Sequence, residues 1–160
     1  MVNSKAKGSQ FEREVCRALS KWVTNGKHAD CFWRSAMSGG RATVAHRKGD
    51  RVRQGGDIAS VSPEGHILVD KYVIECKHVH DLWLASFMLR NTGHTAKFWA
   101  KLIEEAKRDH KLPMLIAKEN RGDIIIIAKT LNRYANPLIT IPARGCNLYL
   151  FSDVVASKFP

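Results

Sequence analysis

Apolar residues recur at helical spacing in two stretches of the chain. We predict a helix over residues 9–23 from a stripe that comprises Phe11, Val15, Leu19, Trp22 and Val23. Asn25-Gly26 follows this stretch and is typical of a helix end. We predict a second helix over residues 95–110, with a buried stripe of Phe98, Trp99, Leu102, Ile103 and Ala106. Residues 81–90 are apolar all round, which indicates a short helix packed on the core or a partner surface.

Shorter apolar runs predict β-strands over residues 30–34, 58–61, 66–77, 114–117, 123–128 and 148–151. Ser62-Pro63-Glu64-Gly65 has the composition of a β-turn, so the second and third of these strands are predicted to form a hairpin. The run from Ile124 to Ile127 does not alternate with polar residues, which suits a strand covered on both faces. A turn or helix is expected after residue 151.

Residues 35–56 lack apolar periodicity and are rich in glycine and basic side chains. From position 34 to position 53, a single aspartate stands against six basic residues: Arg34, Arg41, Arg47, Lys48, Arg51 and Arg53. A loop of this length inside a small domain is commonly functional. We interpret it as a DNA-contacting loop that becomes ordered on binding, and the alternative is a solvated insertion.

The chain as a whole is strongly basic. Its 160 residues carry a formal net charge of +11, and their number suits one domain over residues 1–160. Such an excess of Lys and Arg predicts a polyanionic partner, with plain solubility as the alternative. A membrane partner is disfavoured, because no apolar run approaches the roughly 20 residues of a membrane span. The polar N-terminus lacks a signal-peptide core, which favours an intracellular, cytoplasmic protein.

The cysteines and histidines do not indicate a zinc site. The four cysteines are scattered and form no C-x-x-C pair: Cys16, Cys31, Cys76 and Cys146. Reduced, partly buried thiols are therefore expected. His78 and His80 alternate on a predicted strand but have no partner pair at ligand spacing, so we interpret them as an extension of the basic surface.

The strongest chemical signal lies in Gly55-Gly56-Asp57-Ile58 and Val73-Ile74-Glu75-Cys76-Lys77. On a strand, residues two apart share a face, so Glu75 and Lys77 project together while Cys76 points to the core. Asp57 begins the neighbouring strand and is predicted to meet Glu75 across the hairpin. Two carboxylates offer hard oxygen ligands to Mg²⁺, and the lysine can orient or help deprotonate the attacking water.

Glu-x-Lys is a weak motif alone, since roughly one chance match is expected in a charged chain of this length. Glu105-Ala106-Lys107 also matches, but it lies in a predicted helix, where residues two apart do not share a face. The alternative for Glu75-Cys76-Lys77 is an edge-strand ion pair. Glu12 is a third candidate acid because it follows the core residue Phe11. Its alternative role is in a capping box, Ser9-x-x-Glu12.

The order of the motifs along the chain adds to the evidence from the candidate acids and Lys77. Along the chain stand Lys7-Gly8-Ser9-Gln10-Phe11-Glu12-Arg13-Glu14, Arg34-Ser35-Ala36-Met37-Ser38, Gly56-Asp57-Ile58 and Ile74-Glu75-Cys76-Lys77. Further on come Asp81-Leu82-Trp83, a long helix and Lys111-Leu112-Pro113-Met114-Leu115. This series resembles the archaeal-type Holliday junction resolvases of the PD-(D/E)XK nuclease superfamily.

The resemblance implies an α/β, restriction-endonuclease-like core in which α-helices flank a central mixed β-sheet. It implies a homodimer that nicks opposed strands of four-way DNA junctions in recombination and repair, with no small-molecule cofactor. Asp57 and Glu75 would bind Mg²⁺ or Mn²⁺, Lys77 would be the catalytic lysine, and Glu12 and the Cys76 carbonyl would complete the site. Arg13 and Arg34 would hold phosphates near the site, and Ser38, which aligns with a serine near the site in the family, would contact DNA.

The chain also departs from that family's pattern. Residues 39–54 and the stretch between Asp57 and Glu75 are longer than expected, and Gly56 replaces the proline of a Pro-Asp motif. We predict a metal-dependent junction-resolving endonuclease. The alternatives are a restriction-type or flap-cutting nuclease of the same superfamily, or a non-catalytic basic nucleic-acid-binding module. A dimer interface has candidates in Trp83, Phe87, Met88 and Leu89, with ordinary core packing as the alternative.

Overall fold

The computed structural model describes residues 4–35, 53–131 and 133–160. Its helices are α1 (Ser4–Val23), α3 (Pro63–Lys71), α4 (Leu84–Arg90), α5 (Gly93–Arg108), the 3₁₀ helix η1 (Pro142–Arg144) and α6 (Phe151–Ala156). Its strands are β1 (Phe32–Arg34), β2 (Arg53–Gly55), β3 (Ile58–Ser60), β4 (Tyr72–Val79), β5 (Leu112–Glu119), β6 (Ile124–Ala128), β7 (Ile139–Ile141) and β8 (Cys146–Leu150).

The strands form two sheets. Five of them lie in the order β4-β5-β6-β8-β7, with β4 parallel to β5 and the remaining pairs antiparallel. This sheet is therefore mixed, as predicted. The strands β1, β3 and β2 form a smaller antiparallel sheet. A parallel bridge between Gly56 and Ile74 joins the small sheet to the free edge of β4.

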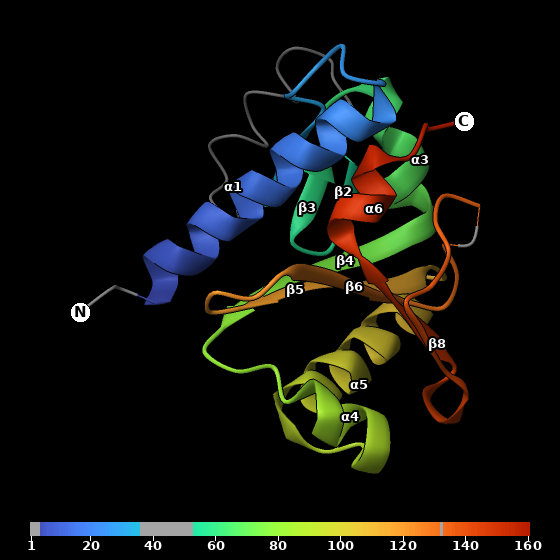
Figure 1. The fold of residues 1–160 in the computed structure, drawn as a ribbon. Coiled ribbons are helices and arrows are strands. Elements are labelled where there is room, and N and C mark those ends of the chain that lie inside the picture. The colour runs from blue at the N-terminus through green and yellow to red at the C-terminus, as the bar shows by residue number, and fades with distance from the viewer. Residues whose placement is uncertain (1–3, 36–52, 132) are drawn as a thin grey trace.

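Helices cover both faces of the five-stranded sheet (Figure 1). On one face α1, α3 and α6 pack over a core that includes Phe11, Leu68, Ile74 and Val154. On the other face α4 and α5 pack over Val73, Phe87, Trp99, Leu102 and Leu115. The alternation of β4 divides its side chains between the two cores, because successive side chains of a strand point to opposite faces. The predicted α/β class with a flanked mixed sheet is confirmed.

The hairpin prediction for residues 58–77 is wrong. Residues 63–71, predicted as part of a turn and of a strand, form helix α3. Pro63 starts it, where a missing N–H costs nothing, and the buried residues Gly65, Leu68 and Val69 recur three and four apart. Ile67 is 51% exposed, which a strand buried along its length would not allow. Consequently β3 reaches β4 through a helix, and Asp57 meets β4 in parallel rather than antiparallel fashion.

The first helix starts earlier than predicted. Because α1 begins at Ser4, Ser9 lies inside the helix and is not its N-cap, so the capping box is wrong. Strand β7 and helix η1 were not predicted. Among the predicted DNA-contacting residues of this segment, Ser38, Arg41, Arg47, Lys48 and Arg51 lie outside the described residues, and Arg53 belongs to β2.

The remaining sequence predictions concern cysteines and membranes. All four cysteines are free and buried, in agreement with the reduced thiols predicted. Within the described residues, no helix is both long enough and apolar enough to span a bilayer. Of the four apolar residues considered for a dimer interface, Phe87 is fully buried in the chain's own core and Met88 packs against it, whereas Trp83 and Leu89 are exposed.

Candidate active site at the edge of strand β4

The backbone around Gly56 lies directly against β4. The Asp57 N–H donates to the Ile74 carbonyl at 2.8 Å. Gly56 has a φ of +80°, and a Cβ placed on it would lie 2.5 Å from the Ile74 carbonyl oxygen. Only glycine fits this approach without displacing the strand. Gly56 therefore permits a close backbone approach to β4, and this approach positions the residue that follows.

The Asp57 side chain continues the contact with the edge strand. Its Oδ2 accepts a hydrogen bond from the Cys76 N–H at 2.9 Å. Asp57 thus contacts β4 through its backbone at Ile74 and through its carboxylate two residues later, at an edge that no other strand of the five-stranded sheet covers. This anchoring holds the carboxylate beside the site even though the predicted hairpin is absent.

Lys77 connects the two acids. Its Nζ forms an ion pair with Glu75 Oε1 and lies 3.7 Å from Asp57 Oδ2. The same ammonium donates to the Cys76 carbonyl at 3.4 Å. Glu75 and Lys77 share one face of β4, as predicted, and the ion pair weighed as an alternative is present. The ammonium is in contact with two carboxylates and a backbone carbonyl, which are all oxygen donors.

The electrostatics of this cluster depend on burial. Burial raises the pKa of Glu75; the Lys77 ammonium opposes this, and the charges of Asp57 and Glu105 add to the rise. For Lys77 burial alone would lower the pKa, but the hydrogen bond to Glu75 and the charges of Glu75 and Asp57 prevail and raise it. Lys77 therefore carries its proton at neutral pH and balances the charge of Glu75.

The donor set fits a hard divalent cation. Two carboxylates and one backbone carbonyl already surround a positive charge, the Lys77 ammonium, which stands in for a metal ion. Among the described residues, no group of three or more His, Cys, Asp or Glu is placed to hold a metal. Mg²⁺ tolerates so few protein ligands because it keeps several waters and takes oxygens from substrate phosphate.

Glu12 and Arg34 form a pair next to this cluster. Arg34 Nε donates to Glu12 Oε2. The neighbouring Ser35 N–H donates to the Asp57 carbonyl at 2.7 Å, so Arg34 is tied to the backbone of the site. Burial raises the pKa of the Cys76 thiol, and the Glu12 charge adds to that rise, which places Glu12 near β4. In this geometry the partner of Glu12 is Arg34, and Arg13 lies apart from it in a groove on α1 with Arg17 and Lys21.

Helix α5 brings to the site Phe98, which the motifs did not include, and Glu105, which belongs to the Glu-x-Lys match that was set aside as helical. The Phe98 ring centroid lies 5.8 Å from Lys77 Nζ, a cation–π contact that restrains the lysine. The Glu105 charge acts on Glu75, although its Glu-x-Lys tripeptide is helical, as predicted. Phe98 and Glu105 are seven residues apart and so lie on one helix face. That spacing was visible in the sequence, but which face meets β4 was not.

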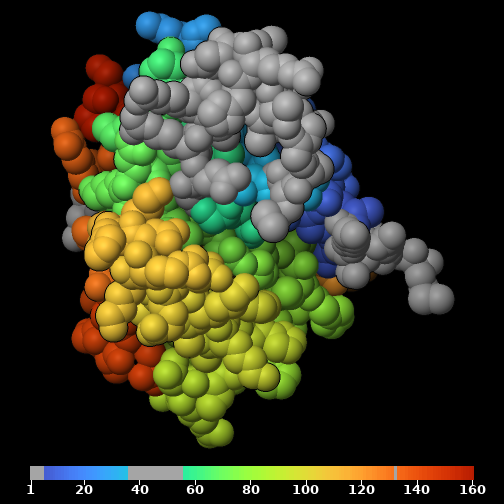
Figure 2. All heavy atoms as spheres, turned by 180° about the vertical axis from the view of Figure 1, so that it is seen from behind, coloured from blue at the N-terminus to red at the C-terminus, as the bar shows by residue number. Residues whose placement is uncertain are grey.

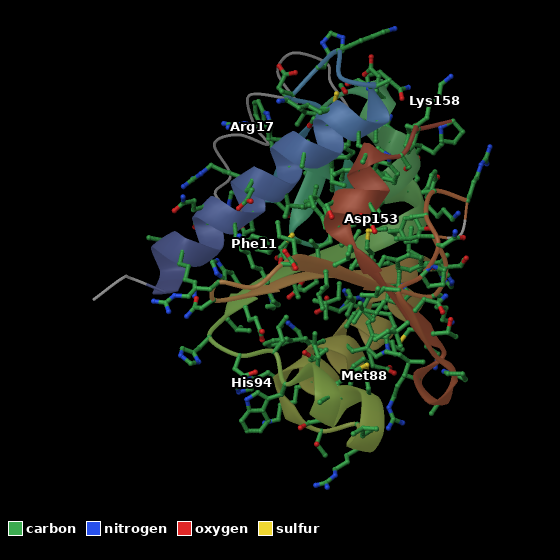
Figure 3. The ribbon with its side chains drawn as sticks, in the orientation of Figure 1. Phe11, Arg17, Met88, His94, Asp153 and Lys158 are labelled. Atoms are coloured by element: carbon green, nitrogen blue, oxygen red, sulfur yellow. The ribbon has the colours of Figure 1, made fainter. Side chains whose placement is uncertain are left out.

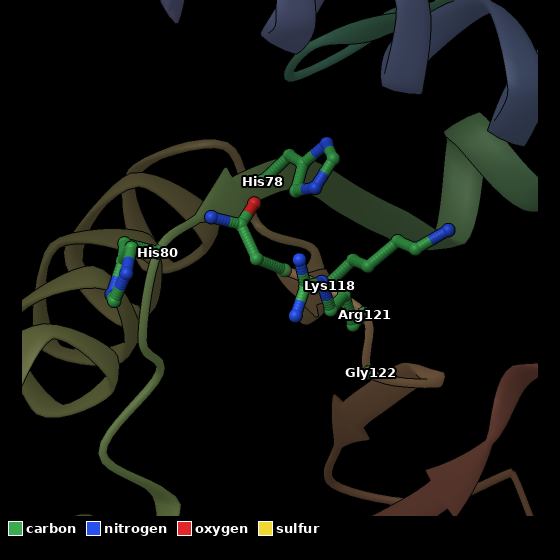
Figure 4. Close-up of a pocket in the computed structure, with 6 residues that line it drawn as sticks. His78, His80, Lys118, Arg121 and Gly122 are labelled. Atoms are coloured by element: carbon green, nitrogen blue, oxygen red, sulfur yellow. The ribbon is translucent and has the colours of Figure 1, made fainter.

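A basic pocket of about 900 Å³ adjoins the end of β4. It is lined by His78, His80, Lys118, Asn120, Arg121 and Gly122, none of which is acidic (Figure 4). Lys7 of α1 donates to Asn120 Oδ1 and ties the helix to the turn after β5. Seen from behind, the segment of β3 and β4 (teal to green) lies between α1 (blue) and α5 (yellow) (Figure 2). His78 and His80 thus belong to a basic surface, as predicted.

Comparison with known proteins places this geometry in context. A family model described as "Phage putative PDDEXK endonuclease" matches residues 3–143, which include every candidate site residue. No curated protein and no solved structure matches the chain significantly. The flanked mixed sheet agrees with the restriction-endonuclease-like fold of PDDEXK nucleases.

Proposed function

The chain belongs to the phage PDDEXK endonuclease family, and we propose that this member is a Mg²⁺-dependent, structure-specific DNA endonuclease that resolves four-way junctions. The observation that carries this proposal is the Lys77 ammonium held by the carboxylates of Asp57 and Glu75. A purely structural ion pair needs one acid. Two acids on one lysine, each partly exposed, provide the charge to retain a cation when the lysine moves aside.

Each residue has a distinct role in the proposed reaction. Asp57, Glu75 and the Cys76 carbonyl would hold the cation, which when bound supplies Lewis-acid polarisation of the scissile phosphate and lowers the pKa of a coordinated water. Burial lowers the pKa of Lys77, but the contact with Glu75 outweighs this effect and raises the pKa, so Lys77 is protonated at neutral pH. It therefore acts as a hydrogen-bond donor that orients the attacking water and offsets negative charge, rather than as a base.

Basic residues near the cluster are proposed to position the DNA backbone. Arg34 lies beside Asp57, and its ion pair with Glu12 fixes its direction. Lys118 and Arg121 offer further cations at the end of β4 and β5. Glu12 contributes by orienting Arg34 and, in a second role, by retaining a metal-bound water at the edge of the site. The residues proposed to extend this surface are Arg13, Ser38, Arg41, Arg47, Lys48, Arg51 and Arg53.

Junction cleavage by a homodimer rests on the ordered motifs that resemble archaeal-type resolvases. Two sites related by a two-fold axis suit two symmetry-related strands. Mn²⁺ is proposed to replace Mg²⁺, since both accept carboxylate and water oxygens. A flap-cutting or restriction-type nuclease of the same superfamily is the other candidate, because the cluster at β4 would serve any of these substrates equally well.

One experiment separates the candidates. A labelled mobile four-way junction and a linear duplex of the same sequence are incubated with the protein, with and without Mg²⁺. Symmetric nicks in the junction alone, dependent on Mg²⁺, support the resolvase. Cuts at one duplex sequence support a restriction enzyme. Tight, salt-sensitive binding of both DNAs with no nick in Mg²⁺ or Mn²⁺ refutes the nuclease assignment for this chain.

A further inference from the structure

Trp83 is held half exposed in an unusual backbone conformation. It precedes α4 with φ 55° and ψ 44°, the left-handed region that bulky residues rarely adopt, and it is 50% exposed. The Asp81 carboxylate accepts its N–H at 2.9 Å, and its carbonyl accepts the Phe87 N–H at 3.0 Å. Strained positions that several contacts hold in place are concentrated at functional sites. Because the indole is half exposed, the hydrogen bonds that hold this backbone conformation do not serve to bury the ring in the core.

A neighbouring loop fixes the direction of the ring. Gly93 has a φ of +88°, and a Cβ placed there would lie 3.0 Å from Trp83 Cβ and Cε3, so the indole packs on bare backbone. The His94 ring stacks on Trp83, with centroids 5.4 Å apart and planes 19° apart. His94 Nδ1 lies 3.2 Å from the Asp81 carbonyl oxygen, so the same aspartate orients both rings. Figure 3 shows His94 at the outer surface of the α4–α5 layer.

The stacked pair is the outer end of an aromatic series that reaches the candidate active site. His94 and Phe98 lie one helical turn apart on α5, with ring centroids at 6.3 Å. Phe98 in turn lies 5.8 Å from Lys77 Nζ. Three successive contacts therefore lead from an exposed indole to the lysine proposed to act in cleavage. The sequence motifs named Trp83 and Lys77 but did not connect them.

We propose that Trp83, backed by His94, is a stacking platform for an unpaired nucleobase of the DNA substrate. One face of the indole lies on His94, and its exposed half can receive a second planar ring. Bases of a continuous duplex are stacked on each other and present no free face, whereas every unpaired base has one. The platform therefore selects branched or flapped DNA in which an unpaired base can reach Trp83 while the scissile phosphate lies at β4. This step rests on the proposed function for the position of the cut.

The surroundings of Trp83 favour a nucleobase over a second protein copy. The indole contacts Gly93, which lacks a side chain, and the polar ring of His94, whereas the core of a protein interface is apolar. The chain also carries a charge of +11, which attracts DNA and repels a copy of itself. A dimer contact through Trp83 is nonetheless a defined outcome of the test.

The test measures binding without cleavage. Affinities are determined in EDTA for a continuous duplex and for the same duplex with three unpaired nucleotides, using wild type, Trp83→Leu and Trp83→Phe. Trp83→Leu should weaken binding of the unpaired DNA about tenfold, since stacking on one aromatic ring is worth that much, and should leave the affinity for the duplex unchanged. Trp83→Phe should retain most of the affinity for the unpaired DNA. Leu89→Ala, which removes an apolar side chain 80% exposed on the same helix, should change neither.

A spectroscopic measurement on the wild-type protein tests the proposal without relying on variants that could fold incorrectly. A 2-aminopurine placed among the unpaired nucleotides should lose fluorescence on binding, and the same base in the paired arm should not. Equal quenching at both positions, equal loss of affinity for both DNAs, or a change of oligomeric mass in Trp83→Leu overturns the proposal. The Asp57→Asn protein should lose nicking and keep the preference for unpaired DNA. A wild-type protein that shows this preference but nicks no DNA in Mg²⁺ or Mn²⁺ counts against the proposed nuclease function alone.

Discussion

The Asp57 carboxylate accepts a hydrogen bond from the Cys76 backbone N–H, across 19 positions of sequence. This bond fixes an acid to the residue that separates Glu75 from Lys77. The orientation of Asp57 therefore depends on the backbone of β4 rather than on a flexible loop. The site can assemble because Gly56 allows its segment to approach β4 closely. A preorganised set of charges of this kind costs no rearrangement during reaction.

Replacement of Gly56 by alanine should remove activity by moving Asp57. The new Cβ would lie 2.5 Å from the Ile74 carbonyl, and a φ of +80° costs an alanine about 1–2 kcal/mol in addition. Thermal unfolding and nicking of a DNA substrate report the two effects. Gly26→Ala is the matched control, because Gly26 has a φ of +86° and open space around it, so it should lower stability without affecting nicking. Equal nicking by both variants would mean that the approach of Gly56 to β4 is dispensable.

The lysine of the site should be needed for cleavage and not for binding. Lys77→Met and Glu75→Gln should each lower the cleavage rate at least about 100-fold, as the loss of one preorganised charged group does at other active sites. DNA affinity in EDTA should change little, because neither residue belongs to the basic surface. Lys107→Met, in the helical copy of the motif, removes the same charge and should cleave normally. If the Lys107 and Lys77 variants cleaved alike, the ammonium between Asp57 and Glu75 would have no part in catalysis.

The sequence was sufficient to predict the elements whose apolar stripe is long. It was insufficient where the same residues suit two kinds of structure. Helices α1 and α5 are 20 and 16 residues long and carry apolar stripes at helical spacing, so their type was predictable. In residues 63–71 the apolar positions are few, and Pro63 followed by Gly65 suits a turn as well as a helix start. Burial of Leu68 and Val69 against the sheet decides in favour of the helix, and that information is tertiary.

The site was predictable in its residues but only partly in its geometry. Alternation on a strand was enough to place Glu75 and Lys77 on one face. The edge contact of Asp57 depends on the order of strands in the sheet, which no local pattern encodes. Phe98 reaches Lys77 through the packing of α5 on the second face of the sheet, and Trp83 is connected to Phe98 only through His94. Aromatic residues at helical spacing predict burial, so the proximity of Phe98 to Lys77 had no signature in the sequence.

The pH dependence of cleavage should reflect the environment of Glu75. Burial raises the pKa of its carboxyl, and the charges of Asp57 and Glu105 raise it further against the opposing effect of Lys77. Because the ionised form is needed, activity should fall, as the pH decreases, at a higher pH than an ordinary glutamate would give. Glu105→Gln removes one like charge, lowers the pKa of Glu75 and should move this acid limb to lower pH.

The pH profile of nicking at limiting Mg²⁺ measures that shift. Glu104→Gln is the control, because it removes the same charge from an exposed position of the same helix. An acid limb that stays fixed in Glu105→Gln, or that moves equally in both variants, would contradict the coupling between Glu105 and Glu75.

The basic pocket should contribute to DNA affinity through phosphate contacts alone. Lys118→Ala and Arg121→Ala each remove one cation from a pocket whose lining holds no acid. Each should weaken binding of paired and unpaired DNA to the same degree and reduce the slope of log affinity against log salt by about 0.9, the value for one phosphate contact. Lys158→Ala is the matched control: Lys158 follows Ser157, which hydrogen-bonds Trp22 near the opposite end of α1, about 22 Å along the helix from Lys7. A Lys158 variant with the same loss of slope would show that net charge, and not the pocket, governs binding.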